Sequence, residues 1–486
     1  MTAASPAPVQ DVSARAEAPL VLDTAPPRTL DFRALFSLWA NLGVSLIGFT
    51  SAATVIGVKG AELSLAAAIT ATVAGTAIGT SMLGVAALIG ARTGAPAMAL
   101  LRGLFGTRLS YVPTVLNIAQ CIGWGVYELL VIAMGAQEVT GTQGWRWLFV
   151  LLAGVLTTAL TIWPLGSIAV LRKYVTIAVG IAMVYFTVQL VRQGVPNPGA
   201  GNWTGFLTAT DAIIAVSISF VPLAADYTRH ARTASSAYWA TFSGYSLAQV
   251  WCYLLGVVAL LQSDGDATRI FSSFTGVAAG WAFLLVLVIR ETDQSFANVY
   301  STAMSVQNLL PKVDRRLLTG GIGALVTVLA LNIEEFTASY YAFLGLIGAV
   351  FVPMFAVLAA DYFLGTGRTA PSRRGAPVSK RRSEEGSEAT AGGTTVDTGS
   401  KRPGGERAST SWNLDEDAPA RPLMLLPWAL GFATYQFIAP TAIDGWQGFW
   451  QDLQSSVGFT PQAWISASLF AFLVAGLATL AVQPRK

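Results

Sequence analysis

The sequence predicts an all-α integral membrane protein with about twelve transmembrane helices. The 486-residue chain is 53% hydrophobic and only 12% charged, whereas soluble chains carry about 25% charged residues. Hydrophobic runs close to the ~20 residues that cross a bilayer recur along its whole length. The 47 glycines and 14 tryptophans are typical of closely packed membrane helices with aromatic residues at the interfaces.

The hydrophobic runs follow one another with short polar connections, and their boundaries are good to ~2–4 residues. They lie at about 35–56, 66–90, 110–136, 147–164, 174–191, 206–225, 237–261, 279–309, 317–333, 337–364, 421–440 and 462–482.

Two segments are too polar to join this bundle. Residues 1–34 are rich in alanine and proline and lack the apolar stretch of a signal peptide. Residues 366–420 are charged and of low complexity, so they cannot bury enough apolar surface to fold. We expect a disordered cytoplasmic tail at 1–34 and a disordered cytoplasmic linker at 366–420. They leave a ten-helix core at 35–365 and two peripheral helices at 421–486.

The connections between the runs alternate in charge. Lys and Arg are retained on the cytoplasmic side of a membrane, so the basic set predicts that both termini are cytoplasmic, as an even helix count requires. The basic set is Arg92, Arg102, Arg108, Arg172, Lys173, Arg229, Arg232, Lys312, Arg315, Arg316, Arg485 and Lys486. The acidic set is Glu62, Glu138, Asp264, Asp266, Glu334, Glu335 and Asp444.

The eighth run is interrupted by ionisable residues in the stretch IRETDQSFANVY, residues 289–300. Glu291 lies about 18 Å into the span at 1.5 Å per residue, where a charge costs at least ~2.5–3.5 kcal/mol. Arg290 and Glu291 can form an internal salt bridge or serve a gate. For Asp293 we favour a function, because the hydroxyl and amide groups beside it suit cation coordination or proton transfer.

The third run carries a polar stripe. Gln120, Trp124 and Glu128 follow one another at intervals of four and so share one helical face. An aromatic ring between an amide and a carboxylate suits a flat polar heterocycle, which stacks on the ring and donates hydrogen bonds to the carboxylate. The alternative is contact between neighbouring helices.

Two further runs contain helix-breaking features. Pro222 lies inside the sixth run, which ends at Asp226, and proline removes a backbone hydrogen bond. The first run has a comparable soft region with Gly43, Ser45 and Gly48. Interrupted helices in corresponding positions indicate inverted repeats with a binding site at the break.

Five motifs in order resemble the nucleobase:cation symporter-1 family, the purine/cytosine permeases, over roughly residues 35–365. They are IGARTGAPAMALLRGLFG, CIGWGVYE, LAADYTR, FANVYSTAMSVQN and FLGLIGAVFVPMFAVLAADYFL. The resemblance implies an inverted-repeat transport core of five plus five helices, of the APC/LeuT type. Helices one and six would be unwound, helices eleven and twelve peripheral, and access would alternate around one substrate.

The resemblance also implies site residues. Trp124 would stack on the substrate and Glu128 bond to it, although relatives commonly carry Gln or Asn there. Phe220, Ser217 and Ser219 on the sixth helix and Asn298 on the eighth would complete the pocket, beside Gln120. Ion coupling would use Thr292, Asp293, Gln294 and Ser295 with Gly43 and Ser45 of the first helix. Sodium could bind at Thr292 and Asp293, or Asp293 could carry a proton. Pro222, Asp226, Arg290 and Glu291 would be gating or structural residues.

The expected function is therefore import of a nucleobase such as cytosine or a purine, by symport with H+ or Na+, across the cell (inner or plasma) membrane. Another heterocycle, such as hydroxymethylpyrimidine, allantoin or a hydantoin, is the first alternative. A substrate sensor on a transporter scaffold, or a channel, is the alternative from another class. The sequence has no nucleophile–base constellation, so we expect no enzyme, no cofactor and no nucleic-acid partner. A monomer would suffice.

Overall fold

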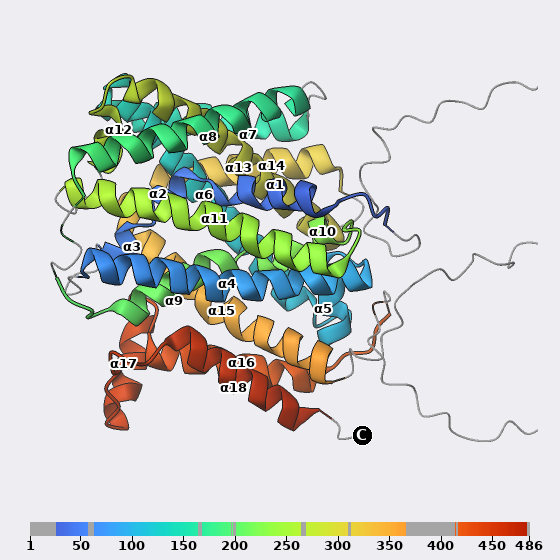
Figure 1. Cartoon of the computed structure of the whole chain (residues 1–486). Helices are drawn as coiled ribbons and strands as arrows, with labels where there is room; N and C mark the ends of the chain where they lie inside the picture. The colour runs from blue at the N-terminus through green and yellow to red at the C-terminus, as the bar shows by residue number, and fades with distance from the viewer. Residues whose placement is uncertain are drawn as a thin grey trace, which may run out of the picture.

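The computed structural model describes residues 26–56, 63–163, 168–195, 197, 201–263, 269–309, 313–365, 414 and 417–483. Within these ranges the regular elements are helices, and the only β-pairing is two isolated bridges, Leu30 with Ala231 and Leu63 with Asn202. The predicted all-α class is thereby confirmed. Figure 1 shows the long helices running roughly along one common axis, as in a membrane bundle.

Each hydrophobic run predicted from the sequence coincides with helix over most of its described residues. The first half of the chain forms α1 (Phe32–Gly43), α2 (Leu46–Thr50), α3 (Ala53–Ile56), α4 (Leu65–Thr93), α5 (Ala97–Phe105), α6 (Tyr111–Thr140), η1 (Gln143–Trp145), α7 (Arg146–Ile162) and α8 (Ile168–Gln193). The second half forms α9 (Phe206–Ile218), α10 (Val221–Thr228), α11 (Ala234–Gln262), α12 (Ser272–Thr275), α13 (Gly280–Leu309), α14 (Arg315–Asn332), α15 (Phe336–Leu364), η4 (Pro422–Met424), α16 (Leu425–Ile438), α17 (Trp446–Ser456) and α18 (Ala467–Val482).

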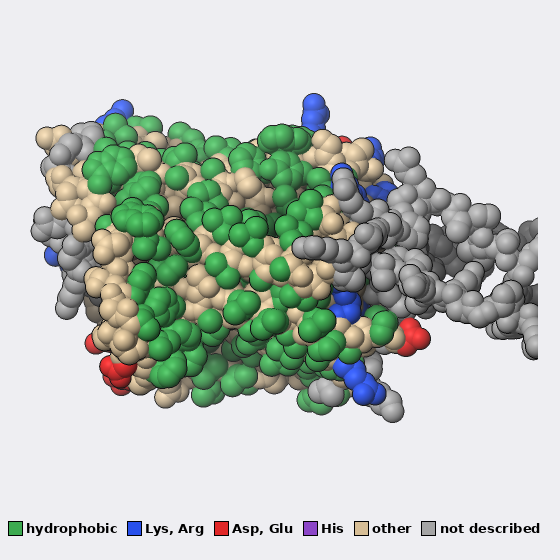
Figure 2. All heavy atoms as spheres, turned by 90° about the horizontal axis from the view of Figure 1, so that it is seen from below, with side chains coloured by type: hydrophobic (Ala, Val, Ile, Leu, Met, Phe, Trp, Pro, Cys, Tyr) green, Lys and Arg blue, Asp and Glu red, His purple; other side chains and the backbone are tan. Residues whose placement is uncertain are grey.

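In the described part of the chain, seven helices are long and apolar enough to cross a membrane, or eight if the bent first pair is one span. The charged α13 is not among them, and α18 is a shorter apolar helix. The count of twelve spans and the inverted repeat therefore stay predictions. Figure 2 shows a broad hydrophobic face whose charged side chains gather at its two ends, as expected of a surface that faces lipid.

The helices form two groups with the cavity described below between them. One group consists of α6, α7, α13 and α14, which pack on one another. The other consists of α1, α4, α9, α10 and α11, in which α11 packs along both α1 and α4. The short helix α2 contacts α6, α11 and α13, so it lies where the two groups meet.

The first span is broken at its centre, as the sequence predicted. α1 ends at Gly43, α2 begins at Leu46, and the two parts are bent by 54°. Val44 and Ser45 between them are extended, and Ser45 caps α2 by accepting a hydrogen bond from the Ile47 N–H. The break leaves the last carbonyl groups of α1 without partners inside the helix.

The sixth span is interrupted over only two residues, whereas an unwound helix was predicted. Only Ser219 and Phe220 separate α9 from α10, and both keep right-handed helical angles. Pro222 lies in the first turn of α10, where its missing N–H costs little. Two hydrogen bonds between residues three apart bridge the interruption. The Phe220 N–H donates to the Ser217 carbonyl (3.3 Å), and the Leu223 N–H donates to the Phe220 carbonyl (3.0 Å).

Glycines allow α11 to approach the broken span closely. A Cβ on Gly256 would lie 2.2 Å from the Phe49 carbonyl oxygen, and one on Gly244 would lie 2.6 Å from the Phe36 carbonyl oxygen. Any larger residue would push α11 away from α1 and α2. These contacts fix the position of the break relative to the second group of helices.

The C-terminal helices are fastened to the bundle at both ends. Arg421 makes a two-pronged ion pair with the fully buried Asp361 of α15, at 2.8 and 2.9 Å. At the opposite end, the buried Asp211 of α9 accepts hydrogen bonds from Ser466 and from the Ala467 N–H at the start of α18. Of the predicted tail and linker, residues 1–25, 366–413 and 415–416 lie outside the described residues.

Candidate functional site

A small cavity of about 50 Å³ lies beside the break in the first span. Ligand pockets usually measure ~300–1,000 Å³, so the lining side chains must move apart to admit a ring. Its lining includes Leu42, Gly43 and Ser45 of the break, Trp124 and Glu128 of α6, Phe220 and Tyr227 of the sixth span, Tyr245, Gln249 and Tyr253 of α11, and Gln294, Asn298 and Ser301 of α13.

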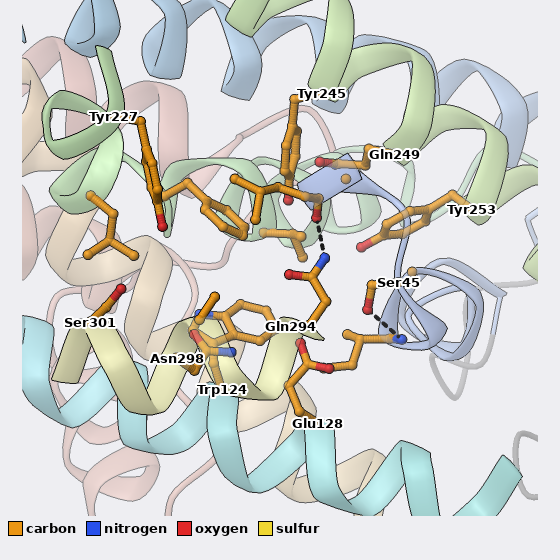
Figure 3. Close-up of a pocket in the computed structure, with 18 residues that line it drawn as sticks. Ser45, Trp124, Glu128, Tyr227, Tyr245, Gln249, Tyr253, Gln294, Asn298 and Ser301 are labelled. Atoms are coloured by element: carbon orange, nitrogen blue, oxygen red, sulfur yellow. Dashed lines mark hydrogen bonds between the residues drawn. The ribbon is translucent and has the colours of Figure 1, made fainter. Parts of the chain in front are cut away.

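The polar stripe of α6 forms one wall. Trp124 and Glu128 are 8% and 5% exposed, and Figure 3 shows both side chains projecting from α6 toward the centre of the cavity. The Trp124 ring is held edge-on by Phe343 and Tyr340, with ring centroids at 5.2 and 6.1 Å. Neither the indole N–H nor Glu128 Oε2 has a hydrogen-bond partner among the described residues, so this wall presents polar groups that a ligand can satisfy.

The opposite wall comes from α10 and α11. Tyr227, Tyr245 and Tyr253 face α6 across the cavity, with Gln249 beside them (Figure 3). Gln249 accepts a hydrogen bond from Ser217 at 2.9 Å. These residues were not predicted from the sequence, although the spacing of Tyr245, Gln249 and Tyr253 by four within an apolar run is a signal of the same kind as the stripe on α6.

The phenyl ring of Phe220 belongs to the same wall. It packs on Tyr245 at 5.1 Å and on the edge of Trp39 at 6.2 Å. Its predicted neighbours Ser217 and Ser219 are buried but do not line the cavity. Ser219 donates to the Val216 carbonyl at 2.7 Å.

Gln120, the first member of the predicted stripe, also stays outside the cavity lining. Its amide donates to the Ser219 carbonyl at the interruption of the sixth span and to Asn117, at 2.9 and 2.8 Å. Gln120 therefore ties α6 to the sixth span. Asp226 accepts a hydrogen bond from the Ala97 N–H at 2.9 Å and lies away from the cavity, which fits a structural role.

On α13, the polar residues split between the cavity and other surroundings. Gln294, predicted to take part in ion coupling, and Asn298, predicted to bind substrate, both line the cavity. Ser295 is buried, and Thr292 and Asp293 are partly buried, but none of the three lines it. The Thr292 hydroxyl donates to the Ile289 carbonyl of its own helix at 2.7 Å.

Arg290 and Gln294 reach across to the broken span. Arg290 donates to the backbone and side-chain oxygens of Asn41, at 2.5 and 3.1 Å. The Gln294 amide donates to the carbonyls of Leu42 and Val44, at 2.6 and 3.4 Å; the first of these bonds is visible in Figure 3. These N–H groups satisfy carbonyl groups that the break leaves without partners.

Glu291 is the least exposed acid of this region, at 1%. Its oxygens accept hydrogen bonds from the Ser45 hydroxyl (2.5 Å) and from the Leu46 N–H (2.9 Å) at the break. The carboxyl groups of Glu128 and Glu291 are hydrogen-bonding neighbours. Within the described ranges, no group of three or more His, Cys, Asp or Glu residues is arranged to hold a metal ion.

The known proteins that this chain resembles are permeases and transporters. A family profile described as a permease for cytosine/purines, uracil, thiamine and allantoin matches residues 24–374. YxlA of Bacillus subtilis (strain 168), named as a purine-cytosine permease, is 24% identical over 350 residues, covering 68% of this chain and 75% of YxlA. The allantoin permease of the same organism is 27% identical over 169 residues, covering 33% of this chain and 34% of that protein.

Two solved structures share the fold. The inward-facing conformation of Mhp1 is 15% identical with a TM-score of 0.71, covering 96% of this chain and 94% of Mhp1. The closed conformation of Mhp1 with bromovinylhydantoin bound, described as a nucleobase-cation-symport-1 family transporter, is 15% identical with a TM-score of 0.63, covering 96% of both chains. Since the family profile spans most of the sequence, this chain belongs to the nucleobase:cation symporter-1 family of permeases and is a transporter, not an enzyme.

Proposed function

We propose that this protein imports a nucleobase such as cytosine or a purine by alternating access, through the cavity beside the broken first span. The observation that carries the proposal is the wall made by Trp124 and Glu128, which places an aromatic face and a carboxyl group side by side. Both residues are buried, and the indole N–H and one carboxyl oxygen have no partner among the described residues.

The chemistry of the lining suits a flat ring with several polar edges. An aromatic ring stacks on Trp124, while Glu128, Gln249, Gln294 and Asn298 supply acceptors and amide groups around its rim. A site built to hydrogen-bond such edges discriminates strongly against analogues that lack them. The closely packed tyrosines on the opposite side would cover the second face of the ring.

Another heterocycle is the second candidate, because the same wall accepts any ring that presents adjacent N–H groups. Allantoin, a hydantoin and hydroxymethylpyrimidine fall in this class. One relative is named as an allantoin permease, and one structural neighbour binds a substituted hydantoin. The carboxyl group of Glu128 alone does not choose between these rings and a nucleobase.

A thermal-shift screen of the purified protein tests this assignment. The panel would contain cytosine, uracil, adenine, guanine, hypoxanthine, allantoin, a hydantoin and hydroxymethylpyrimidine. A ligand that binds only the folded state raises the melting temperature. We expect a nucleobase to do so in the wild type and not in Trp124→Ala. Stabilisation only by another ring would move the substrate to the second candidate, and a shift that survives in Trp124→Ala would contradict the proposed site.

The proposal places the protein in the cell membrane with both termini in the cytoplasm and residues 35–365 as the transport core. Alternation of basic and acidic connections in the sequence supports this orientation. Transport would be driven by symport with H+ or Na+. The carbonyl groups at the broken span already accept hydrogen bonds from Arg290 and Gln294, which favours H+ over Na+.

A further inference from the structure

The oxygens exposed by the broken first span are already bonded to N–H donors. In transporters with broken helices, such backbone carbonyls are the groups that coordinate a coupling cation. Here the Asn41 carbonyl accepts from the Arg290 guanidinium at 2.5 Å, and the Leu42 carbonyl accepts from the Gln294 amide at 2.6 Å. A sodium ion would have to displace these donors, one of which carries a fixed positive charge.

Two buried carboxyl groups lie next to these contacts, Glu128 on α6 and Glu291 on α13. Glu291 acts as a hydrogen-bond acceptor through both oxygens, from Ser45 at 2.5 Å and from the Leu46 N–H at 2.9 Å. Its neighbour Glu128 has an oxygen, Oε2, that receives no hydrogen bond from the described residues. An ionised carboxylate only accepts hydrogen bonds, whereas a protonated one can also donate.

The charges around the pair also indicate that one of the two carboxyl groups is protonated. Arg290 supplies one positive charge next to two carboxyl groups. Two close carboxylates in a buried site cannot both ionise without a large cost, so the pair retains one proton. Glu291 already accepts two hydrogen bonds, so Glu128 Oε2 gains a partner if Glu128 is protonated and donates to Glu291.

We propose that Glu128 and Glu291 share one proton, that this proton is the coupling ion of transport, and that the break in the first span binds no sodium. The inference rests on the proposed function only for its transport consequence. Because Glu128 also lines the cavity, a ligand that bonds to it competes with Glu291 for the same carboxyl group. Ligand and proton are thereby linked, and each must change the affinity of the protein for the other.

Among the described residues, the ionisable side chains that face the pair from α11 are a phenol and a thiol. Tyr245 of α11 faces Glu128, and Cys252 of α11 faces Glu291 and Arg290; phenol and thiol groups are ordinarily neutral at pH 7. At the break between α1 and α2, the Ser45 hydroxyl and the Leu46 N–H donate to Glu291. Asp293 follows on α13 but lies outside the cavity lining.

Infrared difference spectroscopy of the lipid-reconstituted protein tests the shared proton without any substrate. A protonated carboxyl group has a carbonyl stretch that is separate from the carboxylate bands and shifts in D2O. At neutral pH we expect such a band in the wild type and its loss in both Glu128→Gln and Glu291→Gln. Glu138→Gln, the same change ten residues further along α6, should keep the band. Glu128→Asp should keep a protonated acid at a shifted frequency, which covers the case in which a Gln variant fails to fold.

The melting temperature tests the absence of a sodium site. We expect the same value in sodium chloride and in choline chloride of equal concentration. A saturable stabilisation by sodium in the wild type would overturn the inference. So would a carboxyl band that is missing in the wild type, or one that persists in both Gln variants.

Transport in proteoliposomes then tests coupling, with cytosine as the probe. Glu128→Gln keeps an N–H donor for Glu291 and mimics the protonated pair. It should therefore lose accumulation driven by a pH gradient, while wild type and Glu138→Gln retain it. Loss of pH-driven accumulation in Asp293→Asn with full retention in Glu128→Gln would assign the proton to Asp293 and overturn the pair. If wild type carries neither cytosine nor a purine base, the proposed substrate is wrong, and the infrared and sodium experiments still decide the shared proton.

Discussion

Trp124 and Glu128 illustrate how much chemistry two residues at a helical spacing can define. Their spacing of four put them on one face of a helix, and the structure directs that face into a cavity at the broken span. Gln120, at the same spacing, instead bonds to the interruption of the sixth span. A shared face therefore predicted which side of α6 is polar, but not which neighbour each residue would meet.

Replacing Trp124 separates stacking from packing. Trp124→Ala should weaken ligand binding by about 5- to 160-fold, because a base–aromatic stack contributes ~1–3 kcal/mol. Trp124→Phe keeps an aromatic face and should lose less. Binding is measured by titration of the ligand against the melting temperature. Equal affinity in Trp124→Ala and the wild type would remove Trp124 from the site.

The polar residues of α13 show what the sequence could not predict at the scale of single residues. The sequence marked residues 290–295 as a polar interruption, and we favoured Asp293 as the coupling residue. In the structure, Glu291 and Gln294 contact the broken span, while Thr292 and Asp293 do not line the cavity. Successive helical residues point about 100° apart, so a shift of one or two positions along α13 decides which group meets α1. An apolar run gives no independent measure of that rotation.

Among the elements, the broken first span depends on its close contact with α11. Long hydrophobic runs predicted the long helices, because burial in lipid requires continuous apolar sequence. Most of the ends agree to within about four residues, but α8 begins six residues earlier and α18 five residues later than predicted. The short helices α5, α12 and α17 were not predicted, since they are too short to carry a periodic signal. The small residues of α11 gave no warning that two helices would approach within backbone contact.

Gly256→Ala tests that contact. The new Cβ would meet the Phe49 carbonyl oxygen at 2.2 Å, and overpacking of this kind typically costs about 1–3 kcal/mol. We expect a lower melting temperature and impaired transport. The matched control is Gly180→Ala in the lipid-facing part of α8, where a Cβ would meet nothing within 4 Å. It should be neutral or stabilising by up to about 1 kcal/mol. Equal effects of the two substitutions would show that the contact is unimportant.

The attachment of the C-terminal helices is a second test at this scale. Asp361 is fully buried and accepts hydrogen bonds from Arg421 and Gln483. Arg421→Ala would remove the cation that pairs with Asp361 at 2.8 Å, and breaking a buried ion pair typically costs about 3–5 kcal/mol. Arg421→Lys keeps the charge but not the two-pronged geometry and should cost less. Thermal unfolding measures both, and an unchanged melting temperature in Arg421→Ala would contradict the structural role of the pair.

At the scale of the whole molecule, the charge distribution predicts the orientation in the membrane. Residues 26–31, which lie beside the loop after α10, are at the predicted cytoplasmic end. The turn η1 follows α6, in a connection predicted to lie on the opposite side of the membrane. Gly144 is exposed there and would accept a side chain freely. The native cysteines Cys121 and Cys252 are both buried, so an introduced cysteine is a clean reporter.

A membrane-impermeant maleimide reagent should label Gly144→Cys in intact cells, and Arg232→Cys only after the membrane is opened. Arg232 is exposed in the connection between α10 and α11. The reverse pattern would invert the proposed orientation.

The family membership fixes the transporter class, and the cavity beside the broken span is its proposed substrate site. The most direct test is uptake of labelled cytosine, uracil, adenine and hypoxanthine into proteoliposomes, comparing wild type with Trp124→Ala. We predict that at least one base is taken up saturably by the wild type and that its uptake is lost in the variant. Uptake of none of these bases, or uptake of one that is unchanged in Trp124→Ala, would contradict the proposal that this protein carries nucleobases through that cavity.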